Sequence, residues 1–204
     1  MTATGESTFE SDPTEPPESW GQAIAGSAIV QTLAAMVGVT LVGELLGPGM
    51  VVLAAPIAER PWTVLTSVYA HETLGHLLGN ALVIATAGTI VAYATTTLRF
   101  HGFVIATGAI AGLTEVLLGS VLGWKVGVLG ISGAGFALLG YVIASNRASA
   151  RLGDYLSRRA AIVFAVLLGT GLTVLFSGSN AALVAHFVGA LLGLTAGRYR
   201  LLSV

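Results

Sequence analysis

Two residues that could act as a nucleophile and its general base stand far apart in otherwise apolar sequence. Ser132 lies in the glycine-rich run 126–141, and His186 lies in an apolar run near the C-terminal end. A serine hydroxyl attacks a carbonyl poorly unless a base takes its proton, and an imidazole does this near neutral pH. Serine and glycine in an apolar run also serve simple helix packing. The pair taken alone therefore leaves both interpretations open.

A second group of polar residues could stabilise an oxyanion. His76 and Asn80 are four residues apart, so on a helix they share one face. The Asn80 amide, the His76 ring and the backbone N–H of Ser132 could donate to the charge that develops during acyl transfer. Gly130 is a further candidate for oxyanion or substrate binding. The alternative role of His76 and Asn80 is interhelical hydrogen bonding.

Residue types and spacing disfavour two other kinds of site. The only aspartates are Asp12, in the N-terminal stretch, and Asp154, in a loop predicted on the opposite side of the membrane. We therefore expect a Ser–His dyad and not a triad with aspartate. His71 and His76 resemble the zinc motif H-E-x-x-H with one residue too many, which separates them by about 140° on a helix. We expect no metal centre and no cofactor.

Composition identifies the chain as an integral membrane protein. Its 204 residues are 54% hydrophobic and only 9% charged, whereas soluble domains carry about 25% charged residues. A net charge of −1 gives no indication of nucleic-acid binding. Residues 1–20 are acidic and proline-rich, which predicts a disordered cytoplasmic tail. Residues 21–204 are then the membrane domain, with the lipid bilayer as its surroundings.

Apolar runs predict six membrane-spanning helices and hence an all-α polytopic bundle. The hydrocarbon layer is about 30 Å thick, which takes about 20 residues of helix. The predicted spans are residues 22–46, 68–94, 102–122, 132–145, 160–176 and 180–195, of which the fourth is short. The apolar stretch 50–57 is too short to span.

Basic residues predict the orientation of these spans. Of the nine Lys and Arg residues, all but Arg60 and Lys125 fall on the side of the N-terminal tail. Loops rich in Lys and Arg stay in the cytoplasm. We therefore expect a multi-pass protein of the cell membrane with both termini in the cytoplasm. The second, fourth and sixth spans then enter from the outer face, each with its polar residues in its first half.

These motifs, in this order, resemble those of the rhomboid intramembrane serine proteases. The resemblance runs from about residue 61 to residue 197, and the following segments carry it: 61–67 (PWTVLTS), His71, 76–80 (HLLGN), 130–133 (GISG), Gly140, 185–189 (AHFVG) and Gly193. It implies a six-helix rhomboid-like bundle with Ser132 as nucleophile and His186 as its base. It also implies that His76 and Asn80 serve the oxyanion and that Phe136 packs against the base.

The predicted function is an intramembrane serine endopeptidase that cleaves transmembrane segments of membrane proteins near the outer face. One alternative is a non-proteolytic rhomboid-like protein that binds membrane helices in the same groove. Another is a small transporter, which the uniformly apolar inner halves of the even-numbered spans disfavour.

Two further features are expected to shape the site. A glycine recurs at every fourth position over residues 189–197, and small residues at this spacing let helices approach closely. This face should bring the sixth span onto the fourth, and His186 onto Ser132. Glu115, in the outer half of the third span, is expected to be a protonated or hydrogen-bonded packing residue, with a substrate contact as the alternative.

Overall fold

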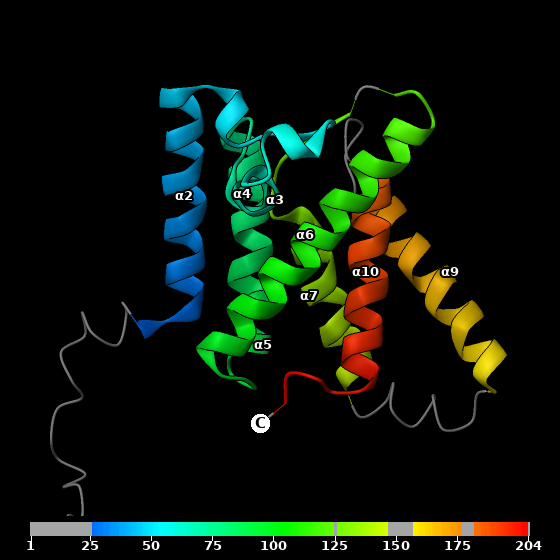
Figure 1. The fold of residues 1–204 in the computed structure, drawn as a ribbon. Helices are drawn as coiled ribbons and strands as arrows, with labels where there is room; N and C mark the ends of the chain where they lie inside the picture. The colour runs from blue at the N-terminus through cyan, green and yellow to red at the C-terminus, as the bar shows by residue number, and fades with distance from the viewer. Residues whose placement is uncertain (1–25, 125, 147–156, 177–181, 204) are drawn as a thin grey trace, which may run out of the picture.

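The computed structural model describes residues 26–124, 126–146, 157–176 and 182–203, so the predicted acidic tail lies outside the described residues. These residues form a helical bundle with one short pair of strands (Figure 1). In Figure 1 the start of α2 and the C-terminal end of α10 lie at the same end of the bundle, and the strand pair lies toward the other end.

The principal helices follow the predicted spans. They are α2 (Ala28–Leu46), α4 (Leu74–Val83), the π-helical turn η3 (Ile84–Gly88), α5 (Thr89–Ala92), α6 (Thr97–Val121), α7 (Ser132–Ser145), α9 (Arg158–Phe176) and α10 (Leu183–Arg198). The loop between α2 and α4 holds η1 (Pro48–Met50), β1 (Leu53–Ala54), η2 (Ile57–Glu59) and α3 (Thr63–Tyr69). Strand β1 pairs antiparallel with β2 (Gly127–Val128), directly before α7.

Helix length separates the bundle into two groups. Among the described residues, three helices are long and apolar enough to cross a membrane, at residues 28–46, 74–92 and 97–121. Apolar helical stretches of 10–17 residues lie at 132–145, at 159–175 within α9, and at 183–198. The fold is therefore the expected all-α membrane bundle, while the count of six spans stays a prediction. The longest helix, α6, has 25 residues, whereas α7 has 14 and α10 has 16.

The second predicted span begins too early. The chain leaves the helical conformation at Ala70, which is extended, and α4 starts only after Thr73. The Thr73 hydroxyl accepts a hydrogen bond of 3.1 Å from the backbone N–H of His76, as an N-cap residue does. His71 and Glu72 therefore lie in the connection between α3 and α4 and not on the spanning helix.

Helices α7 and α10 pack with their backbones in contact. A Cβ atom added to Gly189 would overlap the carbonyl of Gly133, and one added to Gly193 would overlap the carbonyl of Ala137. In the opposite direction, a Cβ on Gly140 would lie 2.6 Å from the carbonyl oxygen of Ala190. The close approach predicted from the glycine spacing is confirmed.

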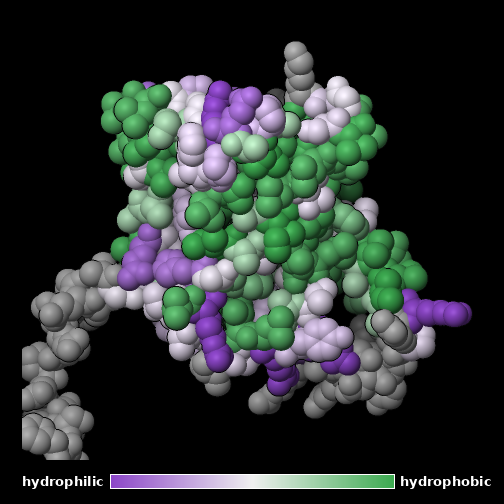
Figure 2. Space-filling model, viewed as in Figure 1, coloured by the Kyte–Doolittle hydropathy of each residue, from purple (hydrophilic) through white to green (hydrophobic). Residues whose placement is uncertain are grey.

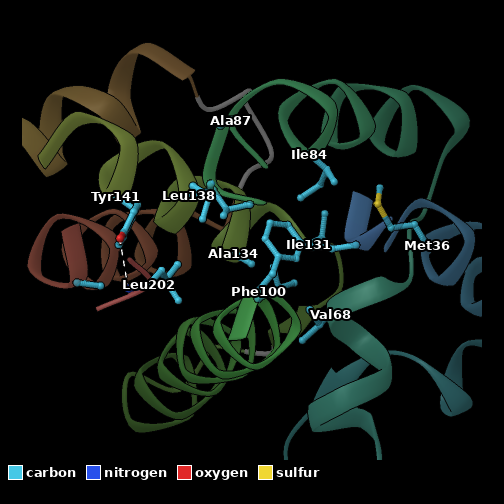
Figure 3. Packing of buried hydrophobic residues seen from close by; sticks show 14 residues of the cluster. Met36, Val68, Ile84, Ala87, Phe100, Ile131, Ala134, Leu138, Tyr141 and Leu202 are labelled. Carbon is cyan, nitrogen blue, oxygen red and sulfur yellow. Dashed lines mark hydrogen bonds between the residues drawn. The ribbon is translucent and has the colours of Figure 1, made fainter. Parts of the chain in front are cut away.

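The main apolar core lies along α7, from Ile131 to Tyr141. Figure 3 shows side chains from α2, η3, α6 and α7 gathered there, among them Met36, Ile84, Phe100 and Leu138. Ile131, the residue before α7, is fully buried in this cluster. A smaller cluster of Leu53, Val116 and Val128 seats the strand pair against α6. Both clusters fix the chain on either side of the loop that leads into α7.

The outer surface of the bundle is apolar around its middle. Figure 2 shows hydrophobic residues over most of the waist, with hydrophilic side chains gathered toward the two ends. Large side chains on this surface include Leu82, 65% exposed, and Leu167, 66% exposed. Such a surface is suited to hydrocarbon and not to water.

Prediction: Gly193→Ala lowers the free energy of unfolding by about 1–3 kcal/mol, because the new Cβ meets a rigid backbone carbonyl. Gly171→Ala is the matched control. A Cβ at Gly171, in the middle of α9, meets no atom within 4 Å, so its unfolding free energy should stay unchanged or rise by up to about 1 kcal/mol. Denaturant unfolding in detergent measures both, and equal effects would contradict the proposed packing constraint.

Candidate active site

The structure brings Ser132 and His186 into hydrogen-bond contact. Ser132 is the first residue of α7, and His186 lies in the first turn of α10. The Ser132 Oγ atom lies 2.8 Å from His186 Nε2, although the residues are 54 positions apart in the chain. With Nε2 unprotonated, the hydroxyl donates to the imidazole, which is the arrangement a nucleophile and its base require. The main contact predicted from the sequence is present.

An aromatic ring fixes one face of the His186 imidazole. The Phe136 ring stacks on it with centroids 4.3 Å apart and an interplanar angle of 15°. Phe136 stands four residues after Ser132 on α7, so one helix carries both the hydroxyl and the ring. The expected packing of Phe136 against the base is confirmed. The stacking restricts rotation of the imidazole away from the serine.

Helix α4 presents His76 and Asn80 on the other side of the hydroxyl. Asn80 is buried, and its Nδ2 donates to the backbone carbonyl of His76 at 3.1 Å. An amide nitrogen carries two hydrogens, so this contact leaves one of them for another acceptor. The His76 ring is half-buried. Both side chains share one face of α4, as their spacing predicts.

Gly130 shapes the site through its backbone. Its φ is +117°, a conformation that L side chains rarely adopt, and an added Cβ would lie 2.9 Å from Nε2 of His76. Its N–H donates to the carbonyl of Ser67 at 2.8 Å. This N–H is therefore already hydrogen-bonded outside the site. The absence of a side chain at Gly130 leaves space for the His76 ring.

One cavity connects these groups. It has a volume of about 710 Å³ and lies between α4, α7 and the start of α10. Its lining includes His76, Gly79, Asn80 and Val83 from α4, Ser132, Gly135, Phe136 and Leu139 from α7, and His186 from α10. Glu72 and Thr73, from the connection before α4, and residues 127–129 also line it. The four polar candidates therefore face a common space large enough for several residues of a peptide.

The His71 ring packs against the His76 ring. Its backbone N–H donates to the Thr40 hydroxyl at 3.1 Å, and its Nδ1 lies 3.0 Å from the Tyr69 carbonyl. Its ring meets the His76 ring edge to face, with centroids 5.1 Å apart. Its hydrogen-bond partners therefore belong to α2 and to the end of α3. The contact with His76 was not predicted, because hydropathy placed His71 on the spanning helix.

Within the part of the chain that the structure describes, no group of three or more His, Cys, Asp or Glu side chains is arranged to hold a metal ion. The His71 and His76 rings meet edge to face, and His71 already contacts a backbone carbonyl through Nδ1.

Glu115 is hydrogen-bonded, in agreement with the first of the two roles expected for it. Its Oε2 atom accepts from the backbone N–H of Ala185 at 2.8 Å. Glu115 lies on α6, 70 residues before Ala185 in the chain. The contact is immediately adjacent to His186.

A comparison of sequences identifies the family of this chain. A comparison with models of protein families matches a Rhomboid domain to residues 58–203. The chain belongs to the rhomboid family. This family includes intramembrane serine proteases and also members without protease activity. A comparison with curated proteins found no matching relative.

Basic residues of this rhomboid gather at one end of the bundle. Arg99 lies in the first turn of α6, Arg159 at the start of α9 and Arg198 at the end of α10, and these helix ends lie at the same end in Figure 1. Arg60 stands in the loop before α3, toward the opposite end. Lys125, Arg147 and Arg151 lie outside the described residues. The described arginines are therefore unevenly distributed between the two ends of the bundle, as the predicted orientation requires. Which end faces the cytoplasm stays a prediction.

Prediction: acidification destabilises this rhomboid through His71. The pKa of His71 is lowered to about 4, mainly by burial and also by the nearby His76 ring, while the contact with the Tyr69 carbonyl acts in the opposite sense. Since the pKa in the unfolded chain is about 6.5, the unfolded state binds the proton first. The stability is complete above about pH 6.5 and is lost as the pH falls toward 4.

Unfolding midpoints in detergent between pH 7 and pH 4 measure this loss. The control is His71→Asn, whose amide nitrogen can replace Nδ1 as donor to the Tyr69 carbonyl but does not titrate. The variant should show a smaller decrease over this range. Parallel curves for the two proteins would show that His71 is not the responsible group.

Prediction: Gly130→Ala slows the reaction of Ser132 with a fluorophosphonate probe about tenfold or more. The added Cβ would lie 2.8 Å from Cε1 of His76 at a strained backbone position. Gly102→Ala, on α6, is the control because a Cβ there meets no atom within 4 Å. Labelling rates measured on folded protein test this, and a native rate in Gly130→Ala would contradict it.

Proposed function

We propose that this rhomboid is an intramembrane serine endopeptidase that cleaves transmembrane segments of membrane proteins. The observation that carries the proposal is the 2.8 Å contact between Ser132 Oγ and His186 Nε2 at a cavity within an apolar bundle. Polar and ionisable side chains within a membrane cost free energy, so their presence there indicates a functional role. The family match supports the same assignment at the level of the family.

In the first step, Ser132 Oγ attacks the carbonyl carbon of the scissile peptide bond. His186 Nε2 takes the hydroxyl proton as the new C–O bond forms. The ring is already aligned, since Phe136 stacks on it and the hydroxyl is within hydrogen-bond distance. The imidazolium then gives this proton to the leaving amine as the C–N bond breaks, which leaves an ester on Ser132.

In the second step, water hydrolyses the ester. His186 removes a proton from the water molecule as its oxygen attacks the ester carbonyl, and it returns the proton to Ser132 Oγ when the acid product leaves. The cavity supplies the route for this water, because it reaches from the loop around Gly127 to the dyad. Hydrolysis inside a membrane bundle depends on such a wet pocket.

The negative charge on the carbonyl oxygen requires hydrogen-bond donors. We assign this role to the His76 ring, the second amide hydrogen of Asn80 and the backbone N–H of Ser132. The first N–H groups of a helix have no partner within it, and the helix dipole favours a negative charge at this position. Removal of one such donor typically costs about 10²- to 10³-fold in rate.

The proposed substrate is a transmembrane helix that unwinds locally. A peptide bond within a helix is shielded, so small or helix-breaking residues near the scissile bond favour cleavage. The dyad lies at the first turns of α7 and α10, near the end of the bundle that we assign to the outer face of the cell membrane. Both termini are then cytoplasmic.

A second candidate function is binding of membrane helices without cleavage. The same cavity, lined by Val83 and Leu139 beyond the polar groups, could accept an apolar segment. The dyad contact favours the enzyme, since a binding groove has no need of an imidazole within 2.8 Å of a serine hydroxyl.

Prediction: Ser132→Ala and His186→Ala each abolish cleavage of a transmembrane substrate in proteoliposomes, and both variants still fold. Removal of the nucleophile or the base eliminates the covalent route. Ser120→Ala and His101→Ala are the matched controls, since Ser120 bonds a carbonyl of its own helix and His101 bonds Gln31. Both controls should cleave at the native rate.

A fluorophosphonate probe separates the two candidate functions. Labelling of Ser132 that disappears in His186→Ala supports the protease. Folded native protein that neither reacts with the probe nor cleaves any helix, but retains transmembrane peptides, would establish the binding function instead.

A further inference from the structure

Helix α10 begins without a side-chain cap of its own. Its N-cap residue is Ala182, and no side chain of the cap residue bonds the first turn. Helices α4 and α6 differ, because Thr73 and Thr96 cap them in the usual way. The first N–H groups of a helix need acceptors from elsewhere when the cap residue is alanine.

Glu115 supplies an acceptor from another helix. Its Oε2 takes the N–H of Ala185, the third residue of α10, at 2.8 Å. This N–H is one that a capping side chain at position 182 would normally bond. A carboxylate at this point also lies at the positive end of the helix dipole. The side chain of Glu115 therefore caps α10 across the interface between two helices.

The same face of α6 also supports α7. Ala111 lies one turn before Glu115 on α6, so both project from one face. A Cβ added to Gly133 would lie 2.8 Å from the Cβ of Ala111. Gly133 directly follows Ser132, just as Ala185 directly precedes His186. One turn of α6 thus holds the residue beside the hydroxyl and the residue beside the imidazole.

We propose that Glu115 is a positioning residue. It fixes the first turn of α10 both along and about the helix axis, and so holds His186 in contact with Ser132. This inference rests on the proposed protease function. Glu115 itself does not touch the reacting atoms in this role. It acts through the Ala185 N–H, and the effect reaches the site because Ala185 is buried and adjacent to His186.

The test compares kinetic constants of purified variants in proteoliposomes. Glu115→Ala should lower kcat about ten- to hundredfold, because a small displacement of the base costs this much. Its KM should stay within about twofold of the native value, since the cavity lining is unchanged. Glu115→Gln keeps a carbonyl oxygen as acceptor for the Ala185 N–H, so it should retain most of the native kcat.

A local cap provides the rescue. Ala182→Asn places a side-chain acceptor at the N-cap of α10. Because Ala182 lines the cavity, the effect of Glu115→Ala is measured both in the native background and in the Ala182→Asn background. The loss of kcat should be smaller in the second background, and this difference is the coupling between the two positions.

Two controls separate positioning from general damage to the fold. Thr114→Val removes a hydroxyl that bonds the Ile110 carbonyl on the same helix, and its kcat should equal that of the native protein. Val91→Ala removes packing from the buried core, and shows how far a loss of stability alone lowers kcat.

The outcomes distinguish this inference from the function on which it rests. Native kcat in Glu115→Ala, or a loss no larger than that of an equally destabilised Val91→Ala, overturns the positioning role and leaves the protease standing. An equal loss in both backgrounds also overturns it. A native protein without any cleavage or labelling of Ser132 overturns both.

Discussion

The arrangement of this rhomboid depends on the backbone contact between α7 and α10. The carbonyls of Gly133 and Ala137 lie where the side chains of residues 189 and 193 would be, so the two helices meet without intervening atoms that could adjust. Glycine within a helix costs up to about 1 kcal/mol relative to alanine, and close packing offsets this in a membrane. A contact made from backbone has a fixed geometry. This contact also fixes the relative positions of the Ser132 hydroxyl and the His186 imidazole, because each residue lies within one helical turn of the contact.

The sequence predicted most of this framework. Residues 132–145 were expected as a helix and form one with the same bounds, because glycines before it and apolar residues along it mark its start and course. The Ser132–His186 contact was predicted from residue chemistry and from the glycine spacing of α10. These features depend on the residue types within one helix or on a glycine repeat along one helix face, and both can be recognised in a single sequence.

Other features could not be derived because they depend on how helices turn toward one another. Hydropathy continues through Val68 and Ala70, so nothing in it marked the break at Ala70 that precedes the Thr73 cap. The engagement of the Gly130 N–H by the Ser67 carbonyl is a contact between distant segments with no local signature. Glu115 was recognisable as an ionisable residue in an apolar span, but its partner is a backbone group. The sixth span was predicted from residue 180, so the sequence did not identify Ala182 as the N-cap residue of α10 or indicate that this helix needs an acceptor from outside.

The unequal helix lengths tie the site to the thickness of the bilayer. At 1.5 Å per residue, α7 is about 21 Å long and α10 about 24 Å, whereas α6 is about 38 Å. A hydrocarbon layer of about 30 Å cannot match all three, and lipids deform at a cost of fractions of a kcal/mol per Å. Most residues of α7 and α10 are buried or half-buried, whereas α2 is largely exposed. Acyl-chain length therefore acts first on exposed helices such as α2, and it reaches the helices that carry Ser132 and His186 through their packing.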